Sequence, residues 1–171
     1  MLIKTVRGFT PQYGKNCFFT ENATLIGEVF MGDDCSVWYQ AVVRGDVNTI
    51  SIGDRVNIQD GALIHGTFEH SSTTIGNDVS IGHNAIVHGC TINDRVLVGM
   101  GSIIMDDSII GSNSIIAAGS LLLKNTKVAE GSVYAGVPAK KIKDVSPELQ
   151  KGEIERIARN YIEYASWFKQ G

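Results

Sequence analysis

Residues 75–110 of the chain, IGNDVSIGHNAIVHGCTINDRVLVGMGSIIMDDSII, carry a repeat with a period of six residues. An aliphatic residue opens each hexad, a glycine often follows it, and a small or β-branched residue stands four positions after it. The aliphatic positions of the whole pattern are Met31, Val37, Val43, Ile52, Ile58, Ile64, Ile75, Ile81, Val87, Ile92, Val98, Ile104, Ile110, Ile116 and Leu122. A period of six does not fit an amphipathic α-helix, whose faces recur about every 3.6 residues.

Each hexad has the length of a flat strand and a corner, so three hexads make one triangular coil. Stacked coils bury a continuous aliphatic column that no single repeat buries alone. We therefore predict an all-β solenoid, a parallel β-helix, over residues 1–130, with its clearest repeats at 31–123. The step from Ile64 to Ile75 is eleven residues instead of six, so the segment GTFEHSSTT is expected to contain a loop that leaves the stack.

The sequence changes character after the repeats. Residues 131–145 are predicted to be a connector, because Gly136 and Pro138 interrupt regular structure. Ser146 followed by Pro147 is a typical helix start. The apolar residues after it recur at three- and four-residue steps, at Ile154, Ile157, Ala158, Tyr161, Ala165 and Phe168. Residues 146–171 are therefore expected to form a C-terminal helix packed on the β-helix, within a single domain.

The composition excludes several classes of partner. Charged residues make up 19% of the 171 residues and the net charge is −3, so we expect no nucleic-acid partner and no anionic membrane partner. The first ten residues, MLIKTVRGFT, do not resemble a leader, and no apolar run is long enough to span a bilayer, so a cytoplasmic protein is expected. Cys17, Cys35 and Cys90 lack CxxC spacing and are expected to be small buried residues.

Three of the four histidines fall inside the repeat. His65 follows Ile64 and His88 follows Val87, in the third hexads of successive coils, so the two imidazoles should lie on one face about 4.8 Å apart at the backbone. His83 comes two residues after Ile81 and leaves from a different face. Within one subunit His83 is therefore not expected to meet the other two.

A cyclic trimer would bring the two faces together, because the second face of one subunit meets the third face of its neighbour. Three imidazoles that converge in this way are typical of a catalytic zinc site with a free fourth position, and Fe²⁺ or Co²⁺ also suits such ligands. The alternative is that each histidine lies alone on the solvated surface. Arg44 lies in the column of His65 and His88, and Asp60 in that of His83, so the two charges should face each other across the interface. They would either orient the ligands or only join the subunits.

Five motifs together resemble the γ-class carbonic anhydrase family of hexapeptide-repeat proteins, over nearly the whole repeat region. They are VVRGDV at 42–47, NIQDG at 57–61, LIHG at 63–66, IGHNAIVHGC at 81–90 and VGMGS at 98–102. The resemblance implies that the β-helix is left-handed. It implies that the metal ligands are His65 and His88 from one subunit and His83 from its neighbour.

The same resemblance implies further site residues. Arg44, Asp46 and Asp60 resemble the family's interface ion network, and Asn57 and Gln59 resemble its polar groups near the bound water or bicarbonate. Tyr161 is similar to a tyrosine that leans over the site, although its ring also fits the packing stripe of the helix.

The activity implied is the reversible hydration of CO₂ to bicarbonate by metal-bound hydroxide at the subunit interfaces, with Gln59 orienting the hydroxide. The sequence departs from the family pattern where Val47 replaces an acidic residue of the proton relay. Glu69 and His70 are the titratable residues of the short loop after His65. They are either a proton relay or solvated loop residues. Metal binding is expected in both cases, and three outcomes stay open: a slow anhydrase, an anhydrase that needs a further condition, or an enzyme with another substrate.

Other functions stay open at this point. The segment YAGVPAKKI at 134–142 resembles the end of the β-helix in hexapeptide acyltransferases. Acyl-CoA thioester hydrolysis and a non-catalytic, metal-binding trimeric scaffold are further alternatives. No organic cofactor is expected.

Overall fold

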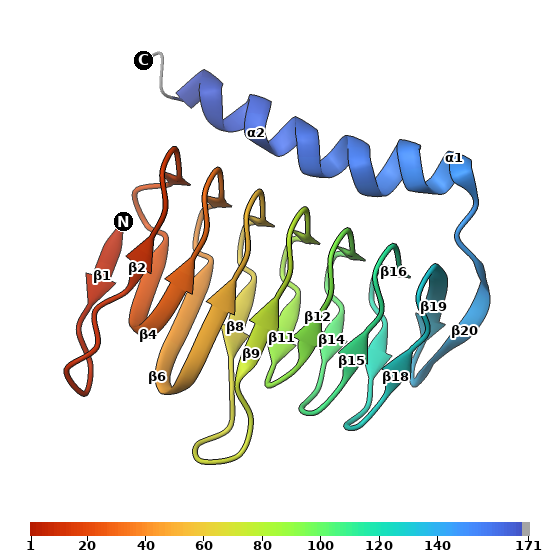
Figure 1. Cartoon of the computed structure of the whole chain (residues 1–171), viewed down its shortest axis with the longest axis horizontal. Helices are drawn as coiled ribbons and strands as arrows, with labels where there is room; N and C mark the ends of the chain where they lie inside the picture. The colour runs from red at the N-terminus through yellow and green to blue at the C-terminus, as the bar shows by residue number, and fades with distance from the viewer. Residues whose placement is uncertain (169–171) are drawn as a thin grey trace.

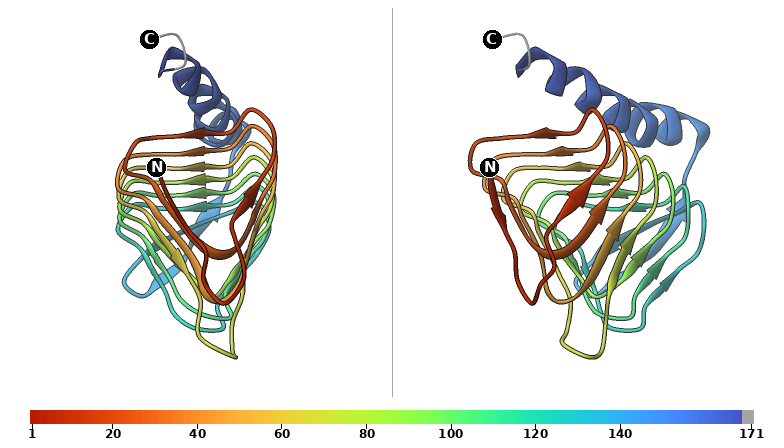
Figure 2. Two further views of the ribbon diagram at one scale, coloured as in Figure 1. Left: turned by 90° about the vertical axis from the view of Figure 1, so that its left-hand side faces the viewer. Right: turned by 60° about the vertical axis from the view of Figure 1, so that its left-hand side comes forward.

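The computed structural model describes residues 1–168, which form a triangular β-helix of about seven coils followed by one helical segment (Figure 1). Seen from its N-terminal end, the chain turns anticlockwise as it recedes from the viewer, so the β-helix is left-handed (Figure 2). The prediction of an all-β solenoid with a C-terminal helix is confirmed.

Each coil crosses three faces, which we name A, B and C in chain order. Face A contains β1 (Leu2–Lys4), the first parts of β4 (Thr24–Met31) and β6 (Val42–Ile52), β8 (Leu63–His65), β11 (Ile86–His88), β14 (Ile103–Ile104) and β17 (Leu121–Leu122). Face B contains β2 (Gln12–Tyr13), the second parts of β4 and β6, β9 (Thr73–Ile75), β12 (Thr91–Ile92), β15 (Ile109–Ile110) and β18 (Lys127–Val128). Face C contains β3 (Phe18–Phe19), β5 (Ser36–Val37), β7 (Asn57–Ile58), β10 (Ser80–Ile81), β13 (Leu97–Val98), β16 (Ile115–Ile116), β19 (Ser132–Gly136) and β20 (Ala139–Asp144).

The aliphatic positions of the hexads form the core. Val87 lies opposite Ile64 on one side and Ile104 on the other, and all three side chains are fully buried. The small positions, such as Ala62 and Ala85, are buried in the same cluster. Burial of one such aliphatic side chain contributes about 1.5–3 kcal/mol. The column therefore holds successive coils in a single register.

The predicted loop lies between β8 and β9, over residues 66–72, and protrudes from the edge between faces A and B (Figures 1 and 2). Its ends meet in a bridge between Thr67 and Ser71. Asn48 Nδ2 ties both sides of the loop to the coil before it, donating to the carbonyl oxygens of Thr67 at 2.7 Å and Ser71 at 3.1 Å. The loop is therefore attached to the β-helix immediately after His65.

The predicted connector at 131–145 is more regular than expected. Strand β19 continues the parallel ladder of β16, and β20 folds back antiparallel to β19. Gly136, with φ +103°, and Pro138 do interrupt regular structure, but only at the turn between these two strands. The residues on either side of the turn keep their backbone groups free to pair, which is why a hairpin forms there.

The C-terminal segment packs on face C. It consists of α1 (Pro147–Leu149), the π-helical turn η1 (Gln150–Glu155) and α2 (Arg156–Phe168). The Ser146 side chain accepts a hydrogen bond from Leu149 N at 3.3 Å, as expected of an N-cap. Ile154 is buried against Ile115 and Val133. Residues 169–171, to which the predicted helix extends, lie outside the described residues. Among residues 1–168, no helix is long and apolar enough to cross a membrane.

Candidate metal centre

His65 and His88 lie side by side on face A. They end strands β8 and β11 and are paired in register, as the hexad positions predict. His65 Nδ1 lies 3.3 Å from His88 Nε2. Two nitrogen ligands at about 2.0–2.1 Å from a tetrahedral zinc ion would be about 3.3–3.4 Å apart. The spacing of the two rings thus fits two ligands of one zinc ion.

A carboxylate holds the other nitrogen of His65. His65 Nε2 lies 3.0 Å from Asp46 Oδ1, and Arg44 Nη1 donates to Asp46 Oδ2 at 2.6 Å. Partial burial raises the pKa of Asp46, but the hydrogen bonds from Arg44 and His65 outweigh it and leave the pKa below its usual value. Burial lowers the pKa of His65, which favours the neutral imidazole that a metal requires.

Asp106 holds His88 in the same way, and the sequence analysis missed it. Its Oδ1 lies 3.1 Å from His88 Nδ1 and accepts hydrogen bonds from the hydroxyls of Thr67, at 2.9 Å, and Ser71. Burial raises the pKa of Asp106, but the hydrogen bonds from Ser71 and Thr67 outweigh it and lower the pKa to about 2. One signal was available: Asp106 stands two residues after Ile104, in the coil that follows His88.

His83 leaves the edge between faces C and A, directly after β10. Gly82 precedes it and stacks tightly on the next coil, since a Cβ atom there would lie 2.6 Å from Met100 N. His83 Nδ1 lies 2.8 Å from Asp60 Oδ2, and its Nε2 lies 3.4 Å from the hydroxyl of Tyr161 in α2. Burial raises the pKa of Tyr161 to about 12. Tyr161 therefore stays a neutral phenol beside His83.

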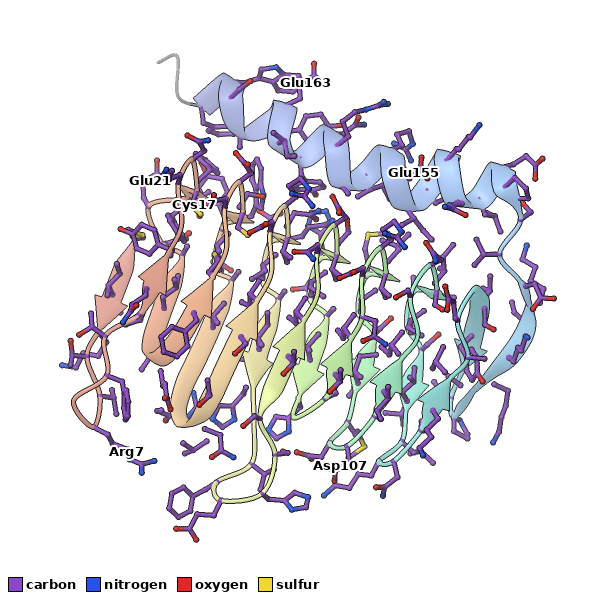
Figure 3. All side chains as sticks on the ribbon, in the orientation of Figure 1. Arg7, Cys17, Glu21, Asp107, Glu155 and Glu163 are labelled. Atoms are coloured by element: carbon purple, nitrogen blue, oxygen red, sulfur yellow. The ribbon has the colours of Figure 1, made fainter. Side chains whose placement is uncertain are left out.

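The two parts of the predicted ligand set lie on different edges of the β-helix. His83 is next to α2, whereas His65 and His88 adjoin the protruding loop. In Figure 3, Glu155 of the helical segment and Asp107, the neighbour of Asp106, are labelled on opposite sides of the molecule. Within residues 1–168 of one chain, no three histidine, cysteine, aspartate or glutamate residues gather to hold a metal ion.

Asn57 and Gln59 lie buried at the end of β7, close to His83 along the edge of face C. Gln59 Nε2 donates to Asn57 Oδ1 at 3.0 Å, and Asn57 Nδ2 donates to Ser80 Oγ at 2.8 Å. These two hydrogen bonds fix the orientation of the Gln59 amide. Its oxygen remains an acceptor for a small molecule in the adjoining cavity.

A cavity of about 440 Å³ lies between part of face C and the helical segment. Gln59, His83 and Tyr161 line it together with apolar side chains from both elements, including Leu97, Ile115, Ile157 and Tyr164. Small-molecule sites commonly combine such apolar walls with a few polar groups. The histidine of this edge is therefore reachable by a ligand in the cavity.

The loop residues Glu69 and His70 lie apart from this cavity. His70 Nε2 lies 2.9 Å from Asp107 Oδ2, and its side chain is 55% exposed. Glu69 sits at the turn of the loop with φ +53°. Their role as a proton relay stays a prediction.

Comparison with known proteins places these residues in a family. Residues 89–124 match the family described as "Bacterial transferase hexapeptide (six repeats)", and residues 72–105 match "Hexapeptide repeat of succinyl-transferase". The chain is 38% identical over 168 residues to "Carbonic anhydrase" of Geobacillus kaustophilus, an alignment that covers 98% of this chain and 91% of that protein. It is 40% identical to "Gamma carbonic anhydrase 2, mitochondrial" of Arabidopsis thaliana over 91% of this chain and 58% of that protein. The chain belongs to the γ-class carbonic anhydrase-like family of hexapeptide-repeat proteins.

A solved structure agrees with this membership. The "hexapeptide transferase family protein" of Anaplasma phagocytophilum superposes with a TM-score of 0.92 at 37% identity and covers 98% of each chain. The carbonic anhydrase names of the relatives and the two hexapeptide-repeat matches confirm the resemblance drawn from the five sequence motifs. Names in this γ-class-like family include both anhydrases and transferases, so membership alone leaves the reaction open.

Proposed function

We propose that this protein is a metal-dependent carbonic anhydrase-like enzyme that reversibly hydrates CO₂ to bicarbonate. The observation that carries the proposal is shared by His65, His83 and His88. Each imidazole has a carboxylate on one ring nitrogen, at 2.8–3.1 Å, so its other nitrogen can bind a metal; in His83 that nitrogen also faces the Tyr161 hydroxyl at 3.4 Å. Carboxylates commonly orient metal-bound histidines in this way. The anhydrase names of relatives support the same reaction.

The active unit of this proposal is a homotrimer. His65 and His88 of one subunit, with His83 of the next, would hold zinc, and Fe²⁺ or Co²⁺ are the alternative metals. The separation of the two half-sites within one chain supports this arrangement, because a threefold axis can bring unlike edges of neighbouring subunits together.

Zinc in this site would supply Lewis-acid chemistry that makes a nucleophilic hydroxide available near neutral pH. The residues of the chain have separate tasks. Asn57 holds Gln59 so that the Gln59 amide oxygen accepts a hydrogen bond from the reacting water and sets its orientation. Tyr161, neutral because of its raised pKa, donates a hydrogen bond toward the reacting oxygen atoms. Glu69 and His70 would pass the released proton to buffer, and Val47 makes this transfer slow.

The cavity beside His83 supports a second candidate function, the hydrolysis or transfer of an acyl group. CO₂ has three heavy atoms, whereas a cavity of about 440 Å³ accommodates a much larger molecule. An apolar acyl chain between Leu97 and Ile157 would place its carbonyl group near His83.

The deciding experiment measures bound metal per subunit and CO₂ hydration by stopped flow on the same preparations. We expect about one metal ion per subunit in the natural protein, and loss of both metal and hydration in His83→Ala. His70→Ala, which changes an exposed histidine outside the ligand set, is the matched control and should keep its metal. Bound metal without hydration would favour the acyl substrate or a scaffold. A metal-free natural protein would rule out the site.

A further inference from the structure

Asp106 is the most enclosed carboxylate near the candidate metal centre. Only 7% of its side chain is exposed, and Lys124 Nζ, at 3.6 Å, is the cation beside it. Exposed carboxylates are hydrated at little cost, but a buried one needs partners. Asp106 obtains these partners from three directions: the hydroxyls of Thr67 and Ser71 in the loop, and the imidazole of His88.

We infer that Asp106 is a positioning residue for the metal, acting through His88. This inference rests on the proposed metal site. His88 Nδ1, facing the carboxylate, is the nitrogen that carries the proton, which leaves the lone pair of Nε2 on the side of His65. If Nδ1 lost this partner, the ring could rotate or adopt the other tautomer, and Nε2 would no longer be held as a ligand.

The loop at residues 66–72 also helps to hold Asp106 against His88. Ser71 and Thr67 donate to the same oxygen, Oδ1, that faces His88, so both hydroxyls fix the direction from which the carboxylate approaches the ring. Thr73, at the end of the loop, donates to the carbonyl oxygen of His65 at 2.6 Å. The loop therefore orients the His88 ring through Asp106, and the strand that follows the loop is tied to the backbone of His65.

Asp107 offers a matched control one residue away. It also pairs with an imidazole, since its Oδ2 lies 2.9 Å from His70 Nε2, but this pair is exposed and His70 is outside the ligand set. If removing a negative charge, or disturbing the edge between faces A and B, weakened zinc binding in general, substitutions of Asp106 and of Asp107 would lower the zinc affinity equally. If Asp106 acts through His88, only the substitution of Asp106 would lower it.

The test compares the zinc affinity of the natural protein, Asp106→Asn and Asp107→Asn. Each metal-free trimer is titrated with Zn²⁺ against a chromogenic chelator, and its thermal unfolding is recorded without metal. We expect Asp106→Asn to bind Zn²⁺ about 10–100-fold more weakly. Asp107→Asn should retain the natural affinity, and both variants should be folded.

Equal affinities in all three folded proteins would overturn the inference, and so would an equal loss in both variants. Ser71→Ala keeps the carboxylate and removes one of its donors, so it decides the question if Asp106→Asn does not fold. A smaller loss of affinity is expected in Ser71→Ala, and an unchanged affinity would count against Asp106. CO₂ hydration is measured separately, so a protein that binds zinc through Asp106 without hydrating CO₂ would refute only the proposed function. A natural protein that binds no zinc would refute both.

Discussion

At the scale of single residues, the three cysteine thiols differ in burial and in pKa because they occupy different places in the coils. Cys17 and Cys35 occupy equivalent positions in successive coils, before the paired strands β3 and β5. Cys35 is buried, whereas Cys17 is half-buried. A hydrogen bond from Cys35 lowers the pKa of Cys17 from 9.0 to about 7, and the same contact raises the pKa of Cys35. Burial raises the pKa of Cys90 to about 12.

These differences predict selective alkylation. The thiolate is the reactive form, so the rate at Cys17 should rise as pH increases through about 7, and fall below it as the thiol becomes protonated. The rate of modification by iodoacetamide would be measured between about pH 5.5 and pH 9, a range that includes the pH at which a perturbed cysteine titrates. Mass spectrometry would identify the modified residue. Cys90 is the internal control and should stay unmodified in the folded protein. Equal labelling of Cys17 and Cys90 would contradict the prediction.

At the scale of an element, the two-residue strands β14, β15 and β18 each have one residue in the core and one on the surface. In β15 the neighbouring isoleucines illustrate this: Ile110 is 0% exposed and Ile109 is 42% exposed. They differ only in the direction of the side chain, because successive residues of a strand point to opposite sides. The hexad pattern assigns Ile110 to the core column.

We therefore expect Ile110→Ala to lower the free energy of unfolding by about 2–5 kcal/mol, since it leaves a cavity in the packed column. Ile109→Ala removes the same atoms from the surface and should cost less than about 1 kcal/mol. Urea unfolding followed by circular dichroism measures both values. Similar losses in the two variants would mean that Ile109 is buried in the assembled protein.

At the scale of the whole molecule, the proposed site is incomplete in one chain. The pair His65 and His88 and the single His83 lie on different edges, so neither edge alone offers three ligands. If the site forms between subunits, a defect in one half-site can be complemented by a subunit that is intact there. This property separates a shared site from a site within one chain.

The complementation is tested by refolding equal amounts of His83→Ala and His65→Ala together. Each homotrimer should lack hydration, but random mixing leaves about a quarter of the interfaces with both natural half-sites, so about a quarter of the natural activity should return. The control mixes His65→Ala with His88→Ala, whose defects affect the same half-site. It should recover nothing, and recovery in the control would refute the assignment of both histidines to one subunit.

The hexad pattern alone was enough to predict the stack of coils and the pairing of His65 with His88. The aliphatic period of six fixes where each side chain lies, because coil closure and burial allow only one register. This is why the pairing of His65 with His88 and the place of the 66–72 loop were predicted correctly. The family, too, was identified from its five motifs.

Which polar groups meet depends on long-range packing that the hexad pattern does not contain. Asp106 contacts Ser71 across 35 residues of sequence, and Tyr161 reaches His83 across 78. No repeat encodes these contacts, because the loop and the helix lie outside the hexad pattern. The hairpin of β19 and β20 was missed for a related reason: Gly136 and Pro138 indicate a turn, but pairing of the flanking residues depends on the last coil being there to receive them.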